Sequence, residues 1–173
     1  LAKYISQGIP NLILILGDLN MATIKKKPNG YGQFGGFTPF GNSTTLLFAL
    51  ATNATGAVID SDSTAAVASG DVIDLGELPA GMRLDDAQIL IKTGMTATIT
   101  GSLGFKYADT DSTEVPQDAA YFISAGDLAT AGRLRANTGK LVTLPKPARL
   151  ILTTGVAANA KASDIKVIVS GEL

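Results

Sequence analysis

Short segments in which apolar and polar residues alternate dominate this chain from Thr44 onward, and they constrain its fold more than any other feature. In the clearest segment, 96–107, Ile99, Leu103 and Phe105 share one face while polar residues take the other. Glycine, proline, aspartate and asparagine separate the segments, and no apolar repeat of helical period lasts beyond about two turns. The pattern predicts an all-β domain.

About eight or nine strands are expected, at spacings of roughly 10 to 15 residues. They lie at 45–52, 56–60, 71–75, 82–92, 96–107, 119–124, 140–144, 149–154 and 164–170. Gly76 is expected to end the third of them, and residues 124–134 to form a turn or a helix-like piece. This count favours a β-sandwich of two sheets, and the jelly roll is the commonest eight-stranded solution.

Histidine and cysteine are both absent from the 173 residues. The chain therefore lacks the usual general base at neutral pH, the Ser-His and Cys-His nucleophile pairs and the commonest ligands of transition metals. Lysine and arginine number 14 against 15 acidic residues, so there is no basic field of the kind that drives nucleic-acid binding. We expect no enzymatic activity, no catalytic residue, no cofactor or metal, and no nucleic-acid partner.

Three groups of carboxylates are candidates for chemistry, and all three favour a structural interpretation; one of them is the polar run 60–63, which contains Asp60 and Asp62. Asp85 and Asp86 are adjacent on an expected strand and should point to opposite faces, which argues against a catalytic pair. The segment 109–114 carries alternating carboxylates as calcium loops do, but it lacks the glycine and the distal glutamate of an EF-hand. A solvated polar loop is the favoured interpretation of this segment.

The first twenty residues contain the most concentrated apolar run of the chain, at 12–16. This run is far shorter than the 18 or so apolar residues of a membrane span, and no signal-peptide cleavage site follows it. A third interpretation is that Met21 is the natural start and that residues 1–20 are a translated leader. We therefore expect no membrane partner, and whether residues 1–20 belong to the mature protein stays open.

Residues 21–43 have no apolar periodicity of a helix or a strand, and we expect an extended arm ahead of a β-sandwich domain at 44–173. Aromatic residues recur in it at a spacing of three, which aligns them on one face of a polyproline-II-like chain. The rings either fold back onto their own domain or lie in a groove of a neighbouring subunit, and the second interpretation is favoured. The candidate contact residues are Lys25, Lys26, Lys27, Tyr31, Phe34, Phe37 and Phe40.

One run of the sequence resembles a known group of proteins. Residues 71–84, DVIDLGELPAGMRL, resemble a signature of small virion proteins of tailed bacteriophages, namely the decoration or cement proteins and the related head-fibre proteins. The resemblance extends loosely over residues 44–173, including the loop at 109–114 and the closing strand at 166–171. It implies a jelly-roll or sandwich protein on the outside of an icosahedral capsid, where it clamps neighbouring subunits and often forms a trimer.

The role implied by this resemblance is a virion structural protein that decorates and stabilises the capsid. Its partners would be the major capsid protein and further copies of itself, most simply a homotrimer, after synthesis in the cytoplasm of the bacterial host. The alternative is a receptor- or glycan-binding domain of a head or tail fibre. Against this alternative, aromatic residues are scarce after residue 50 and tryptophan is absent.

Overall fold

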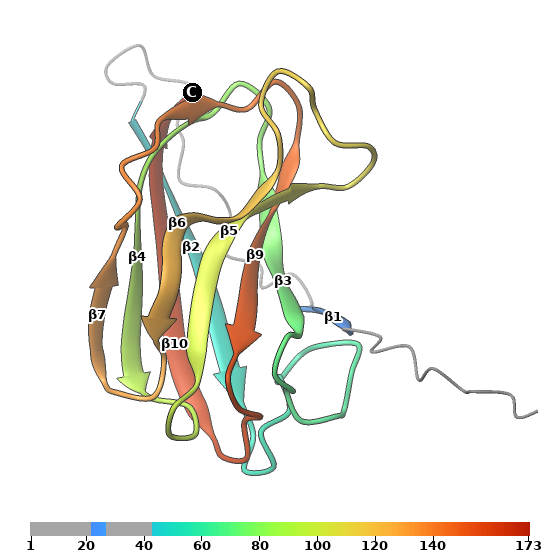
Figure 1. Cartoon of the computed structure of the whole chain (residues 1–173), viewed down its shortest axis with the longest axis vertical. Coiled ribbons are helices and arrows are strands. Elements are labelled where there is room, and N and C mark those ends of the chain that lie inside the picture. The colour runs from blue at the N-terminus through green and yellow to red at the C-terminus, as the bar shows by residue number, and fades with distance from the viewer. Residues whose placement is uncertain (1–21, 27–42) are drawn as a thin grey trace, which may run out of the picture.

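The computed structural model describes residues 22–26 and 43–173, and in these residues the chain forms ten β-strands and no helix (Figure 1). The prediction of an all-β domain is confirmed for these residues. The strands are β1 Thr23–Lys25, β2 Ser43–Thr52, β3 Val72–Leu78, β4 Arg83–Thr93, β5 Thr100–Tyr107, β6 Asp118–Asp127, β7 Gly132–Arg135, β8 Val142–Thr143, β9 Ala148–Gly155 and β10 Ser163–Glu172.

The strands form two sheets that lie face to face (Figure 1). One sheet has the order β1-β3-β9-β5-β6, and the other has the order β2-β10-β4-β7 with β8 paired to β4. The predicted β-sandwich is confirmed. Strands β2 to β5 alternate between the two sheets, and β10 and β9 return beside β2 and β3.

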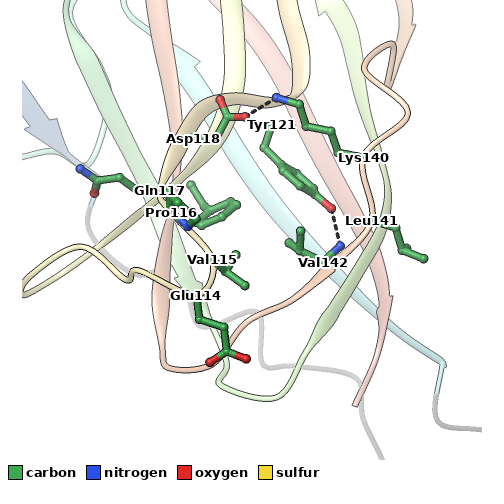
Figure 2. A pocket seen from close by; sticks show the side chains of 10 residues that line it. Glu114, Val115, Pro116, Gln117, Asp118, Tyr121, Lys140, Leu141 and Val142 are labelled. Carbon is green, nitrogen blue, oxygen red and sulfur yellow. Dashed lines mark hydrogen bonds and ion pairs between the residues drawn. The ribbon is translucent and has the colours of Figure 1, made fainter.

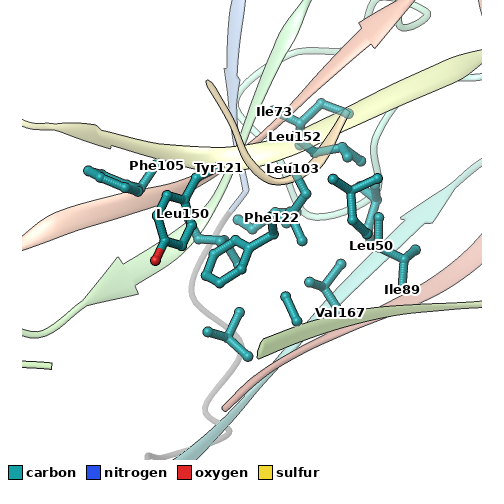
Figure 3. Close-up of a cluster of buried hydrophobic side chains, with 14 of the residues drawn as sticks. Leu50, Ile73, Ile89, Leu103, Phe105, Tyr121, Phe122, Leu150, Leu152 and Val167 are labelled. Carbon is teal, nitrogen blue, oxygen red and sulfur yellow. The ribbon is translucent and has the colours of Figure 1, made fainter. Parts of the chain in front are cut away.

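The inward-facing side chains of both sheets form one hydrophobic core (Figure 3). Leu103, Leu152 and Phe122 contribute from one sheet, and Leu50 and Ile89 contribute from the other; each is at most 2% exposed. Buried and exposed residues alternate along the central strands, as the sequence predicts. Hydrophobic burial of this kind is the main contribution to the stability of the sandwich.

Gly76 lies inside β3 and does not end it. The pairing of β3 with β9 shifts its register between Asp74 and Gly76, and β3 then continues to Leu78. A Cβ atom added at Gly76 would lie 2.6 Å from Cε1 of Phe48, a residue of the facing sheet. The glycine therefore gives room for this ring at a bulge, and the expected strand end at Gly76 is wrong.

A second bulge changes the expected geometry of Asp85 and Asp86. Along β4, Leu84 pairs with Gly171 and Asp86 pairs with Ser170, so Asp85 is the extra residue. The side chains of Asp85 and Asp86 are 36% and 39% exposed, so both lie on the outside. The prediction that they point to opposite faces is wrong because a bulge breaks the two-residue alternation.

Three other predicted segments differ from the structure. Residues 124–134, where a turn or a helix-like piece was expected, contain the end of β6, a bend at 129–131 and the start of β7, so the chain turns there without a helix-like piece. Strand β5 begins at Thr100 and not at residue 96, because Thr98 has a positive φ of 71° that a strand does not allow. The expected partner of β2 at 56–60 is reduced to a single bridge between Thr52 and Val58.

Strand β1 packs with the sandwich, although the sequence places it in the expected arm. It runs parallel to β3, where Ile24 pairs with Ile73 and is only 2% exposed. The rest of that segment, 27–42, and the expected leader at 1–20 lie outside the described residues. The arm itself and its four aromatic contact residues therefore stay predictions.

The segment 57–62 joins the edges of the two sheets. At one end, the amide of Ile59 donates a hydrogen bond to the carbonyl of Ala51 in β2 (2.9 Å). At the other end, the amide of Asp62 donates to the carbonyl of Lys25 in β1 (3.2 Å). This side of the sandwich is thus closed by backbone hydrogen bonds.

We expect replacement of Ile24 by alanine to destabilise the whole sandwich by about 2 to 4 kcal/mol, because it leaves a cavity at the edge of the core. Thr23→Ala, on the exposed face of the same strand, should cost less than about 0.5 kcal/mol. Urea unfolding of both variants checks this prediction. Equal stability of Ile24→Ala and the unaltered protein would show that β1 does not contribute to the core.

Candidate functional site

Of the seven predicted contact residues, the structure describes Lys25 and Lys26; Lys27, Tyr31, Phe34, Phe37 and Phe40 lie outside the described residues. Lys25 is exposed, and its amide donates a hydrogen bond to Oδ1 of Asp62 (3.0 Å). Lys26 is half-buried, and its amide donates to the carbonyl of Asp74 (3.1 Å). The backbone of both lysines is thus fixed at the edge of a sheet and does not belong to a free arm.

Burial lowers the pKa of Lys26, and the nearby charge of Lys166 lowers it further, while the carboxylate of Asp60 raises it. The net shift is downward. Lys166 belongs to β10, which lies in the other sheet.

A hollow of about 470 Å³ lies beside Tyr121 (Figure 2). It is lined by Phe105, Glu114, Val115, Pro116, Gln117, Asp118, Tyr121, Lys140, Leu141 and Val142. The hydroxyl of Tyr121 donates a hydrogen bond to the carbonyl of Leu84 (3.1 Å) and accepts one from the amide of Val142 (3.0 Å). Burial is the main cause that raises the pKa of this hydroxyl, so it stays protonated at neutral pH and ties β6 to β4 and β8.

An ion pair between Lys140 and Asp118 lies at the rim of this hollow (Figure 2). Partial burial pushes the pKa of Asp118 upward, but the hydrogen bonds from Lys140 and from the amide of Ala120, together with the charge of Lys140, outweigh it. The pKa of Asp118 therefore lies below its ordinary value. The folded chain thus favours the ionised carboxylate.

Because the pKa of Asp118 is lower in the folded chain than in the unfolded one, this carboxylate stabilises the fold above its unfolded pKa, and the contribution is lost as the pH falls through the folded pKa. We expect Lys140→Met to lower the free energy of unfolding at pH 7 by less than about 1 kcal/mol, since the pair is partly exposed. The difference should disappear in acid. Unfolding of both proteins across this pH range checks it, with Lys106→Met as a control that should show no such pH dependence.

Two of the three carboxylates of the loop at 109–114, those of Asp109 and Asp111, are engaged within the protein. Asp109 pairs with Nζ of Lys146 (2.9 Å). Oδ1 of Asp111 accepts hydrogen bonds from the amides of Ser112 and Gln117 (both 2.7 Å). In residues 22–26 and 43–173, no three His, Cys, Asp or Glu side chains are grouped so that they could hold a metal ion. The same residues contain no helix that is long and apolar enough to cross a membrane.

A second hollow, of about 370 Å³, lies on the outer face of the sheet β2-β10-β4-β7. It is lined by Leu90, Ile91, Lys92, Gly132, Arg133, Asp164 and Lys166, and we call it the basic hollow. The sequence alone does not reveal this hollow, because its three cations lie on three different strands, β4, β7 and β10. The register brings them together: Leu90 pairs with Lys166 on one side and with Arg133 on the other.

Comparisons with protein families and with curated proteins give no match. The fold is similar to that of a chain in the capsid of Ralstonia phage GP4, with a TM-score of 0.57 and 16% identity over 87% of this chain and 97% of that one. It is also similar to a chain of the cyanophage Pam1 capsid asymmetric unit, with a TM-score of 0.53 and 18% identity over 85% of this chain and 97% of that one. The likeness thus extends over almost the whole of both capsid chains, and at these identities it establishes a shared fold.

Proposed function

We propose that this chain is a structural protein of a bacteriophage virion that decorates the capsid and binds across neighbouring capsid subunits. The observation that carries the proposal is the fold, which matches two phage capsid chains over 97% of their length. Almost the whole length of each of those capsid chains is matched by this chain. A protein of this size and architecture is therefore compatible with a position in a capsid.

The chemistry of the described residues supports a role in binding other proteins rather than in catalysis. A chain without histidine or cysteine lacks the usual catalytic bases and thiols, and the polar groups beside Tyr121 are occupied by structural hydrogen bonds. We propose that the protein catalyses no reaction. It acts on the outer capsid surface after synthesis in the host cytoplasm, with the major capsid protein and further copies of itself, as a homotrimer, as its partners.

The repetition of identical binding sites on a capsid strengthens such binding. A capsid offers many identical sites, and a protein that contacts two neighbouring subunits makes its second contact intramolecularly. Each contact can then be weak while the decorated shell as a whole is stable.

No observation favours the alternative of a glycan-binding domain. Sugar recognition commonly uses exposed aromatic rings, but Phe105, Tyr107, Tyr121 and Phe122 are at most 4% exposed. They pack edge to face in pairs, with ring centroids 4.7 to 5.7 Å apart. In the described part of the chain, these four rings are part of the hydrophobic core.

Co-sedimentation with capsid shells that lack this protein tests the proposal. The shells come from the phage whose genome encodes the chain, and the purified full chain is added in increasing amounts. We expect saturable binding at a fixed ratio to the capsid subunits. Folded protein that stays in the supernatant at every concentration would overturn the proposal.

A further inference from the structure

We propose that the outer face of the sheet β2-β10-β4-β7 docks on the capsid, and that the basic hollow receives carboxylates of an acidic capsid surface. This inference rests on the proposed function and adds the face of the sandwich that contacts the shell and the chemistry of its partner.

The basic hollow holds more positive charge than its own residues neutralise. Asp164 is the one carboxylate among its lining residues. Lys92 and Lys166 both form ion pairs with it, with N···O distances of 3.7 and 3.6 Å. Arg133 is exposed and makes no ion pair within the described residues. Three cations thus share one anion, in a chain whose net charge is −1.

The cations are free to accept a partner. The side chains of Lys92 and Lys166 are 83% and 48% exposed, and their contacts with Asp164 are longer than a good hydrogen bond. A planar guanidinium such as that of Arg133 suits a carboxylate because it can donate two parallel hydrogen bonds. A carboxylate that enters the hollow would therefore add charge-assisted contacts without breaking a strong one.

Apolar residues extend from the hollow across the same face. Leu47 on the edge strand β2 is 48% exposed and pairs with the half-buried Ile168 of β10. Ala49 and Leu90 flank Lys166 on either side. These residues offer apolar area beside the charges, which is the composition of a transient protein interface.

The two parts of the face have different effects on binding. Exposed ion pairs contribute little affinity, but they steer encounter and fix the register of the partner. The apolar strip contributes the area removed from water. We therefore expect binding to shells that weakens as salt is added and that depends on the sign of the charges around the hollow.

Charge reversal at the hollow tests this inference. The double variant Lys92→Glu/Arg133→Glu changes two exposed side chains, and Lys106→Glu/Lys161→Glu is the matched control with the same change in net charge outside the hollow. Thermal unfolding of both variants checks that they are folded. The probe is the undecorated shell, and sedimentation velocity of each free protein reports its self-association.

We expect the hollow variant to bind shells at least about tenfold more weakly than the unaltered chain and the control variant to bind within about twofold. Equal binding by the hollow variant, or equal weakening by the control, would overturn the inference while the proposed function stands. A hollow variant that loses self-association but still binds shells would make a second copy the occupant and also overturn it. Failure of the unaltered chain to bind shells would overturn both.

Discussion

Replacement of Gly56 by alanine is expected to destabilise the protein by about 3 to 5 kcal/mol, a large part of the stability of a domain this size. Gly56 has a φ of +87°, which L-residues adopt at a cost of about 1 to 2 kcal/mol. Its added Cβ would also lie 2.1 Å from the carbonyl oxygen of Asn159, a backbone atom that cannot move aside alone. The clash adds a further cost of overpacking.

Gly81→Ala separates the two causes. Gly81 has a similar φ of +78°, but nothing lies within 4 Å of the position of its Cβ. We expect this variant to lose only about 1 to 2 kcal/mol. Urea unfolding of the two variants in parallel measures the difference, and equal losses would show that the close approach of Gly56 to Asn159 is not a constraint.

Asn159 is the second position at which a single change should have a large effect. It is 1% exposed, and its Oδ1 accepts hydrogen bonds from the amide (3.0 Å) and hydroxyl (3.1 Å) of Thr96. Its Nδ2 donates to the hydroxyl of Thr52 (3.0 Å) and to the carbonyl of Lys161 (2.9 Å). One side chain thus ties together the segments around β2, β5 and β10.

We expect Asn159→Ala to cost about 3 kcal/mol, because several partners lose their hydrogen bonds in a site that water does not readily enter. Asn137→Ala is the control: Asn137 is exposed and accepts one bond from the amide of Ser124, so its loss should be below about 1 kcal/mol. Thermal unfolding of the two variants measures both. A loss at Asn159 no greater than that at Asn137 would contradict the role of this network.

The sequence predicts the fold class because apolar and polar residues alternate along the central strands. Ala87, Ile89 and Ile91 face the core at every second position and are at most 4% exposed. Such a pattern is set by the period of the strand and does not depend on distant partners. The two-sheet arrangement follows because each apolar face needs a second layer to cover it.

The structure differs from the sequence-based prediction where a residue far away in the sequence determines the local backbone structure. Gly76 continues a strand because Phe48 of the facing sheet needs its space, and Asp85 bulges outward within the pairing to β10. Neither cause is visible in the neighbouring residues. Strand β1 was missed because three residues with one buried side chain, Ile24, are too short for a periodic signal.

The candidate contact surface likewise depends on residues that are far apart in the sequence, so the sequence alone does not predict it. Lys92, Arg133 and Lys166 are scattered over 75 positions of the chain, and only the register of β4, β7 and β10 places them around one hollow. The lysine run at 25–27 is visible in the sequence at once, but the structure fixes Lys25 and Lys26 at a sheet edge beside carboxylates. Adjacency in the sequence is therefore a poor guide to which cations are available to a partner.

An electron cryomicroscopy map of the phage particle whose genome encodes this chain tests the central claim most directly. The proposed function predicts density for the β-sandwich on the outer surface of the capsid, repeated with the symmetry of the shell and in contact with neighbouring capsid subunits. A bare outer surface, with the sandwich found in the tail or a fibre or not found in the particle, would contradict it.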